Sequence, residues 1–239
     1  TAYKILSENE WKGYEEEVVC GNCQVREYLM GSNEIFKRTL NQKISQRWWH
    51  VPKGLEDANL KNYYASDPIT KNALHACVNY VKGLESGQSS KKHNLLMMGN
   101  PGTGKSHLAF AIAKYLRKQE IGSVGFTTTG KVLSLIKETY KEGASQTENG
   151  ILNDIANLSF LVLDDLGAEM KSRDEFSWAR SMLFEIINSR LGKPTVYTTN
   201  YDDKTISEVV GERVASRLQQ NTRYINLFTK DYRKNFIVK

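Results

Sequence analysis

The chain has 239 residues, of which 40% are hydrophobic and 25% are charged, and this ordinary balance excludes a globally disordered protein. No apolar stretch approaches the ~20 residues that a membrane-spanning helix needs, and no basic segment followed by an apolar core predicts a secretory signal. The net charge is +6, and residues 211–239 hold seven basic and two acidic side chains, so we expect an anionic partner there.

Residues 1–50 differ in composition from the remainder of the chain. They are rich in Glu, Asn, Gln and aromatic side chains and show no regular alternation of strand and helix patterns. We therefore predict a small N-terminal region over residues 1–50 and one large domain over residues 51–239.

The N-terminal region contains a short cysteine pair. Cys20 and Cys23 have the spacing of half a zinc knuckle, but tetrahedral zinc needs four ligands. Cys77, His50 and His75 are the other candidates, and their spacings match no standard zinc module, so ordinary reduced thiols are the alternative interpretation. Three cysteines also argue against a disulfide framework, and we expect a reducing, cytoplasmic environment.

Residues 99–106 read GNPGTGKS and fit the pattern G-x-x-x-x-G-K-[ST] at every fixed position, between an apolar run and a helical pattern. Glycines let the backbone bend around an anion, so that successive N–H groups and the helix N-terminus point at it. Lys105 supplies a mobile cation for phosphates, and the Ser106 hydroxyl is an oxygen ligand that suits Mg²⁺. The sequence therefore predicts an ATP and Mg²⁺ site. The residues expected to line it are Asn100, Pro101, Gly102, Thr103, Gly104, Lys105, Ser106 and His107.

Short apolar runs alternate with longer amphipathic segments around and beyond this motif, which is typical of βαβ units. After a helix near 67–84 and a polar loop at 85–92, we expect strands at 95–98, 124–127, 160–163, 195–198 and 224–228. Helices are expected near 105–119, 130–140, 175–191 and 205–219. The predicted fold class is α/β, a P-loop NTPase with a parallel five-stranded sheet sandwiched by helices.

Two adjacent carboxylates, Asp164 and Asp165, follow the apolar run 160–163. A buried parallel strand places its last residues at the same sheet edge as the phosphate-binding loop. We expect Asp164 to hold Mg²⁺ through water, and Asp165 to orient or deprotonate an attacking water. The alternative interpretation is a strand that ends in an acidic turn. This alternative is stronger for Asp165 than for Asp164, because an aspartate reaches less far than a glutamate would.

Asn200 ends the next apolar run, with room for one helix and a return strand after Asp164. Its neutral amide would lie at the same sheet edge and could contact both the γ-phosphate and the attacking water. Asn also favours turns, so this role depends on the register of the preceding strand ends.

The chain resembles the DnaC/DnaI/IstB group of AAA+ ATPases, which are replicative helicase loaders and transposition helpers, over roughly residues 48–239. The resemblance rests on the phosphate-binding loop, DDLGAE at 164–169, TTN at 198–200, GERVASRL at 211–218 and DYR at 231–233. It implies the AAA+ form of the P-loop fold with a small N-terminal appendage.

The resemblance implies further residues that act on ATP. Arg217 would be an arginine finger that reaches the ATP of an adjacent subunit in a homo-oligomer, with Arg213 in reserve, and Arg233 would be a sensor. A guanidinium stays charged and binds phosphate oxygens in a forked geometry. Many AAA+ ATPases carry Glu where this chain has Asp165, which predicts slow hydrolysis stimulated by DNA or a partner.

The resemblance also implies single-stranded DNA binding and delivery of a DnaB-type hexameric replicative helicase, which residues 1–50 would dock. We expect DNA contacts at Lys131, Lys137 and Tyr140, because lysines meet phosphates and a tyrosine can stack on a base. An amphipathic helix with a solvated face is the alternative interpretation of this segment.

Three other functions stay open. An IstB-like transposition helper ATPase uses the same core on duplex DNA, and residues 1–50 would determine which partner is bound. A P-loop small-molecule kinase would leave Asn200, Arg217 and Arg233 without a role. A nucleotide-dependent interaction module without meaningful turnover is compatible with Asp165.

Overall fold

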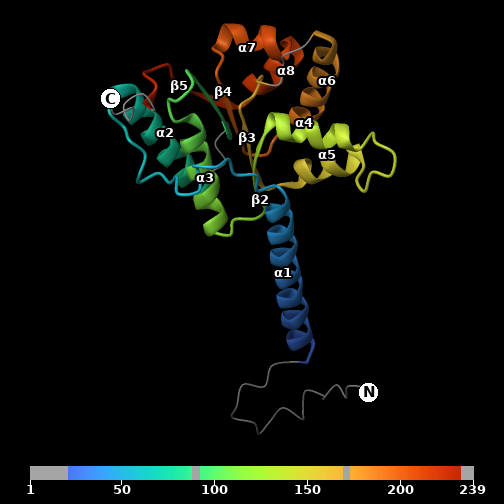
Figure 1. Cartoon of the computed structure of the whole chain (residues 1–239). Coiled ribbons are helices and arrows are strands. Elements are labelled where there is room, and N and C mark those ends of the chain that lie inside the picture. Colours follow the sequence, from blue (N-terminus) through green and yellow to red (C-terminus); the bar gives the residue numbers. More distant parts are fainter. Residues whose placement is uncertain (1–20, 88–91, 169–172, 233–239) are drawn as a thin grey trace. The chain divides into compact units, whose positions relative to one another are not determined.

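The computed structural model describes three stretches of the chain, residues 21–87, 92–168 and 173–232 (Figure 1). For residues 21–30, 32 and 173–176 it describes the backbone alone. The chain divides into two compact units, residues 1–42 and 43–239, and each is described by itself. Within the described part of the chain, no helix has the length and apolar character needed to cross a membrane.

The first unit contains most of α1 (Gly21–Arg47), a helix of 27 residues. Its described side chains are mainly exposed to solvent, including three apolar ones, Ile35 at 68%, Phe36 at 70% and Leu40 at 46%. The sequence pattern did not predict this helix, because its apolar residues do not gather into one stripe at helical spacing.

A five-stranded sheet forms the centre of the second unit, with strand order β2-β3-β4-β1-β5 and every pairing parallel. The strands are β1 (Asn94–Gly99), β2 (Val124–Thr128), β3 (Phe160–Asp164), β4 (Thr195–Thr199) and β5 (Thr222–Leu227). Strands β1 to β4 are buried along almost their whole length, as expected for parallel strands covered on both faces. The predicted parallel five-stranded sheet is confirmed.

Helices cover both faces of this sheet (Figure 1). Leu95 and Met97 of β1 pack with α2 and α3, whereas Leu96 and Met98 pack with α4 to α8, because successive strand residues point to opposite faces. The helices of the second unit are α2 (Pro68–Glu85), α3 (Lys105–Lys118), α4 (Thr129–Glu138), α5 (Glu148–Asn157), α6 (Arg173–Ser189), α7 (Asp203–Val210) and α8 (Glu212–Gln219).

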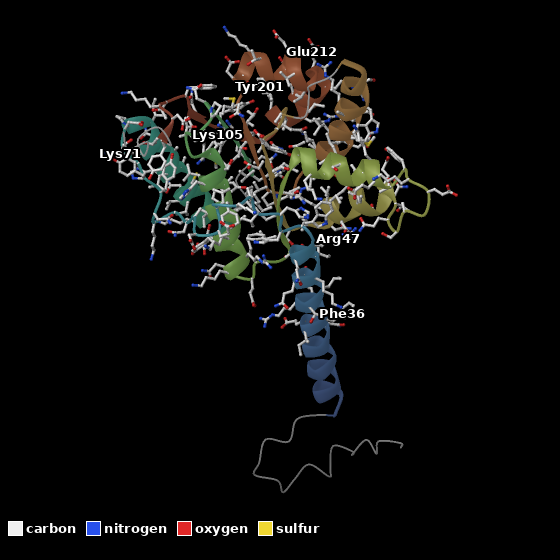
Figure 2. The ribbon with its side chains drawn as sticks, in the orientation of Figure 1. Phe36, Arg47, Lys71, Lys105, Tyr201 and Glu212 are labelled. Carbon is white, nitrogen blue, oxygen red and sulfur yellow. The ribbon has the colours of Figure 1, made fainter. Side chains whose placement is uncertain are left out.

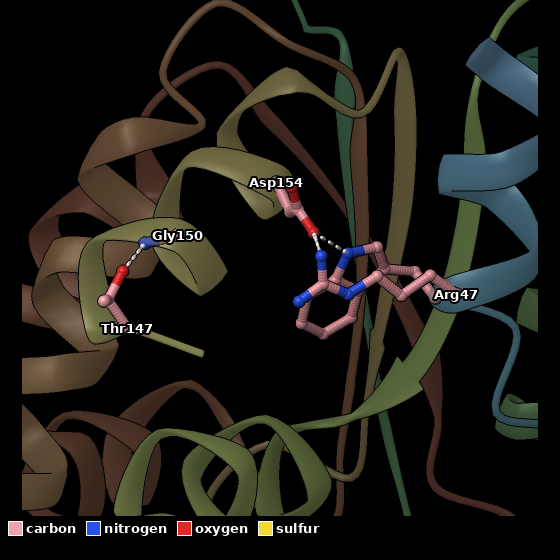
Figure 3. Close-up of polar contacts among 5 residues, drawn as sticks. Arg47, Thr147, Gly150 and Asp154 are labelled. Carbon is pink, nitrogen blue, oxygen red and sulfur yellow. Dashed lines mark hydrogen bonds and ion pairs between the residues drawn. The ribbon is translucent and has the colours of Figure 1, made fainter. Parts of the chain in front are cut away.

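Besides α1, two further helical segments differ from the sequence prediction. Helix α5 was not expected, because its segment is polar and only Ile151 and Ile155 of it are buried; its N-cap Thr147 Oγ1 accepts a 3.1 Å hydrogen bond from the Gly150 N–H (Figure 3). The single helix expected near 205–219 is two helices, because Gly211 between α7 and α8 has a φ of 90° that ends the first helix.

The second unit begins at Lys43, earlier than the predicted boundary at residue 50. Trp48 is 1% exposed, and its backbone oxygen accepts a 2.8 Å hydrogen bond from the Phe126 N–H of β2. Arg47 forms a 2.5 Å ion pair with Asp154 of α5, and the Trp48 indole N–H donates to the same carboxylate at 3.3 Å (Figure 3). Residues 43–49 therefore belong to the unit that carries the sheet, and Arg47 and Trp48 pack into it.

Candidate nucleotide site

The phosphate-binding loop connects the end of β1 at Gly99 to the start of α3 at Lys105. Gly102 and Gly104 have φ angles of 77° and 88°, a conformation that residues with a Cβ rarely adopt. A Cβ on Gly104 would lie 2.6 Å from a ring carbon of Tyr63. Glycine is therefore required at these turns both by backbone conformation and, at Gly104, by the side chain packed against it.

Lys105 lies at the centre of the site and is only 6% exposed (Figure 2). Its Nζ donates hydrogen bonds of 2.8 Å to the backbone oxygens of Gly99 and Asn100 and to Oδ1 of Asn200. Because β1 and β4 are neighbours in the sheet, the ammonium group joins the phosphate-binding loop to the strand end that carries Asn200.

Asp164 is the last residue of β3 and is 4% exposed. Its Oδ1 accepts hydrogen bonds from the Ser106 hydroxyl at 2.9 Å and from the Thr198 hydroxyl at 2.6 Å. Burial raises the pKa of the Asp164 carboxyl, and the two hydroxyl donors oppose that rise. A hydroxyl and a carboxylate in contact are hard oxygen donors, and this donor set fits Mg²⁺.

Asp165 follows directly and is exposed. Its φ of 61° places it in the left-handed region, and its backbone N–H donates a 2.9 Å hydrogen bond to Thr198 Oγ1. Its Oδ1 accepts a 3.1 Å hydrogen bond from the Asn200 side-chain amide. Asn200 therefore bonds both Lys105 and Asp165, and the structure brings together the lysine, both carboxylates and the amide that the sequence singled out.

Aromatic residues that the sequence analysis missed border the loop. The Tyr63 hydroxyl donates to the Thr103 backbone oxygen at 3.2 Å, and its ring lies 5.4 Å from that of His107. The rings of Tyr64 and Tyr232 are 5.5 Å apart, and the Tyr232 N–H donates to the Gly102 oxygen at 2.9 Å. No motif marks Tyr63 and Tyr64, and in the DYR segment only Arg233 was singled out. These tyrosines reach the loop only when the chain folds back over it.

The remaining residues of the loop make local contacts. The Thr103 hydroxyl donates to the Asn100 oxygen at 2.9 Å, and the Asn100 amide donates to the Thr229 oxygen at 3.2 Å. His107 Nε2 lies 3.0 Å from the Asn59 oxygen. Pro101 lies within the turn of the loop. These bonds fix the loop between the segment that precedes α2 and the segment that follows β5.

The two arginines of α8 lie elsewhere on the unit, and Figure 2 labels Glu212 at the start of that helix. Arg213 and Arg217 are one turn apart, with guanidinium carbons 4.4 Å and 5.9 Å from the ring centroid of Phe184 on α6. Arg213 is exposed; Arg217 is half-buried, and its Nε has no hydrogen-bond partner among the described residues. Arg233, the predicted sensor, lies outside the described residues.

The residues expected to contact DNA lie on or just after α4, and two of them share a cluster with Trp178 of α6. The Lys137 ammonium is 5.0 Å from a Trp178 ring centroid, and the Trp178 indole N–H donates to the Tyr140 hydroxyl at 3.2 Å. The Tyr140 hydroxyl in turn donates to the carboxylate of Glu148. Lys131 is exposed in the first turn of α4. No pattern in the sequence indicates Trp178, because its side chain meets α4 only through the packing of α6.

The zinc prediction falls on residues that the structure does not describe fully. Cys20 lies outside the described residues, and of Cys23 only the backbone is described. Cys77 is 0% exposed, and burial raises the pKa of its thiol to about 12. In the described stretches, no group of three or more His, Cys, Asp or Glu is placed to hold a metal ion.

Comparison with known proteins adds independent findings. Residues 37–224 match the sequence model of a family described as IstB-like ATP binding protein. The replicative helicase loader DnaC of Escherichia coli (strain K12) is 28% identical over 178 residues, which cover 74% of this chain and 69% of that protein. The crystal structure of the DnaC helicase loader aligns with a TM-score of 0.63 at 27% identity, over 74% of this chain and 99% of that one. That of DnaI aligns with a TM-score of 0.60 at 26% identity, over 75% and 95%.

Proposed function

Because the chain belongs to the family of IstB-like ATP-binding proteins, we propose that it is an ATP-dependent loader that delivers a hexameric replicative helicase to single-stranded DNA. The AAA+ fold and the membership of an ATPase family are its starting point. The observation that carries the proposal is the hydrogen-bonded set of Lys105, Asp164, Asp165 and Asn200 at one sheet edge, in a chain similar to a helicase loader along 74% of its length.

ATP would bind with its phosphates against the N–H groups of the loop and the ammonium of Lys105. Ser106 and Asp164 would hold Mg²⁺, which when bound neutralises charge on the phosphates. Asp165 would accept a proton from the attacking water, and Asn200, already bonded to Asp165, would fix the direction of that carboxylate. An aspartate, shorter than a glutamate and exposed, is consistent with ATP hydrolysis that requires stimulation by DNA or a partner.

The arginines of α8 would complete the site of an adjacent subunit. Arg213 and Arg217 share one face of a surface helix, and the Phe184 ring supports both guanidinium groups. Arg217 is half-buried, and a guanidinium that stays charged and binds phosphate oxygens in a forked geometry suits a group that acts in an oligomer. Arg217 is the proposed finger, Arg213 its alternative, and Arg233 the proposed sensor.

Single-stranded DNA would bind along α4. Lys131 and Lys137 supply positive charge for the phosphates, and Tyr140 supplies an exposed ring on which a base can stack. Trp178 joins this set, since its ring contacts Lys137 and its indole N–H holds the Tyr140 hydroxyl.

The helicase would dock on the N-terminal region, residues 1–50. On α1, Ile35, Phe36 and Leu40 are the large apolar side chains that the structure describes as exposed in the first unit, and they provide an apolar contact for a partner helix. The partner is then a helicase that offers an apolar surface to this helix.

Co-elution with a DnaB-type hexameric helicase tests the proposal. The Ile35→Asp, Phe36→Asp double variant is expected to lose co-elution while its ATP binding stays unchanged, because both positions lie in the first unit. The Tyr115→Asp variant, which alters an exposed aromatic on α3, is the matched control and is expected to co-elute normally. Normal co-elution of the double variant would remove α1 as the docking element.

A transposition helper ATPase is the second candidate, favoured by the family whose sequence model matches residues 37–224. Such a helper would use the same core on duplex DNA. Competition between single-stranded and duplex DNA for the ATP-bound protein separates the two: preference for the duplex, together with no co-elution with a replicative helicase, would favour the helper.

A further inference from the structure

One buried hydroxyl links the ends of the two strands that carry the acidic and amide residues of the site. Thr198 of β4 is 1% exposed. Its Oγ1 donates a 2.6 Å hydrogen bond to Asp164 Oδ1 and accepts one of 2.9 Å from the Asp165 N–H. A hydroxyl has one proton and two lone pairs, so a single Thr198 rotamer makes both bonds at once.

The first bond fixes the carboxylate that is expected to serve Mg²⁺. Asp164 Oδ1 lies between two hydroxyl donors, Ser106 from the first turn of α3 and Thr198 from β4. Without the Thr198 hydroxyl, this oxygen would keep only the hydrogen bond from Ser106, and the carboxylate could rotate about the Cβ–Cγ bond of Asp164. Mutation of a group that orients a metal ligand typically costs about 10–100-fold in metal affinity or activity.

The second bond fixes the backbone turn that carries Asp165. A φ of 61° is uncommon for a residue with a Cβ and needs support from its surroundings. Thr198 supplies that support twice, since its hydroxyl accepts from the Asp165 N–H and its backbone oxygen accepts from the Leu166 N–H at 2.8 Å. The turn sends the Asp165 side chain toward Asn200, which accepts a bond from Lys105.

We propose that Thr198 is a positioning residue for ATP hydrolysis, acting through Asp164 and Asp165 and never on the nucleotide itself. Its hydroxyl bonds the end of β4 to the end of β3, so that the side chains of Asn200, Asp165 and Asp164 keep fixed positions relative to one another. This inference rests on the proposed ATPase function and adds a residue that no phosphate-binding or acidic motif contains.

The test compares Thr198→Val, which keeps the shape and removes the hydroxyl, with Thr198→Ser, which restores it. Thr199→Val is the matched control, because Thr199 is equally buried on the same strand and its hydroxyl donates to the Leu166 backbone oxygen at 2.8 Å. Binding of a fluorescent ATP analogue to the full chain is measured with Mg²⁺ and with EDTA, beside kcat, KM and the unfolding temperature.

In Thr198→Val, the gain in nucleotide affinity that Mg²⁺ provides is expected to shrink, and kcat to fall, by ~10-fold or more, as for other groups that orient metal ligands. Affinity in EDTA is expected to stay the same. Thr198→Ser is expected to recover most of both quantities, and Thr199→Val to behave as the wild type. If Thr198→Val does not fold, Thr198→Cys, which weakens the donor at similar size, takes its place.

Two results overturn the inference: a Val variant with wild-type kcat and Mg²⁺ response, or a Thr199→Val variant with equal losses. Both leave the proposed function intact. A wild-type chain that binds no nucleotide in either buffer overturns the proposed function itself, and the role of Thr198 with it.

Discussion

The carboxyl edge of the sheet and the surface around α8 use basic side chains in opposite ways. At the edge, Lys105 is buried and donates to three oxygen atoms of its own chain, each at 2.8 Å. On α8, Arg213 and Arg217 lie over the Phe184 ring instead. The edge is therefore preorganised within one chain, whereas we propose that the arginines act on a partner subunit. Changes at the edge should affect an isolated subunit, and changes on α8 should affect only an assembly.

The largest expected effect on nucleotide affinity comes from Lys105. Lys105→Ala removes the ammonium that bonds Asn200 and the phosphate-binding loop, and it would leave a bound triphosphate without this cation. Equilibrium titration with a fluorescent ATP analogue should show affinity lower by at least ~100-fold. Lys114→Ala, on the same helix, is the control and should bind normally. Unchanged affinity of the Lys105 variant would remove the nucleotide site from this edge.

An effect confined to hydrolysis, and conditional on assembly, is expected for Arg217. Arg217→Ala should bind ATP within ~2-fold of the wild type, yet lose DNA-stimulated hydrolysis by ~10³-fold, the range of an arginine finger. Because the arginine would act on a neighbour's ATP, mixing this variant with Asp165→Asn protein should restore part of the activity. A mixture as inactive as its components would contradict action between subunits, and Arg213→Ala shows whether the other arginine of α8 carries the role.

The sequence predicted the edge better than the surface, and the reason is physical. Parallel strands end at one edge, so the motif residues Lys105, Asp164 and Asn200 had to converge once the strands were recognised. Thr198 lies in the TTN segment, where only Asn200 was singled out, and Tyr63 lies in no motif, since the roles of both depend on contacts made only after folding. Helix α5 was missed for a related reason, because a polar segment with few buried residues has no clear period.

A substitution in the aromatic cluster of Tyr140 and Trp178 beside α4 is expected to have a moderate effect, on DNA binding and not on ATP binding. Tyr140→Ala should weaken affinity for single-stranded DNA by about 10-fold, within the range for loss of one stacked base. Tyr115 is a matched control, because both tyrosines are exposed and both hydroxyls contact a glutamate, Glu148 for Tyr140 and Glu85 for Tyr115. Fluorescence anisotropy of a labelled oligonucleotide measures both variants. Equal losses in the two would place the DNA elsewhere.

The smallest effect is expected at the ion pair between Arg47 and Asp154, which contributes to stability alone. Arg47 is 42% exposed in its side chain, so Arg47→Ala should lower the free energy of unfolding by less than about 1 kcal/mol, as for surface ion pairs. Asp154→Ala should cost more, about 1–3 kcal/mol, because it also leaves the indole N–H of the buried Trp48 without its acceptor. Urea denaturation measures both, and neither variant should change ATP or DNA affinity. If Arg47→Ala lowered the free energy of unfolding more than Asp154→Ala, the ion pair and not the indole hydrogen bond would be the main contribution of Asp154. The stability of residues 43–49 would then depend on charge, as the nucleotide edge does.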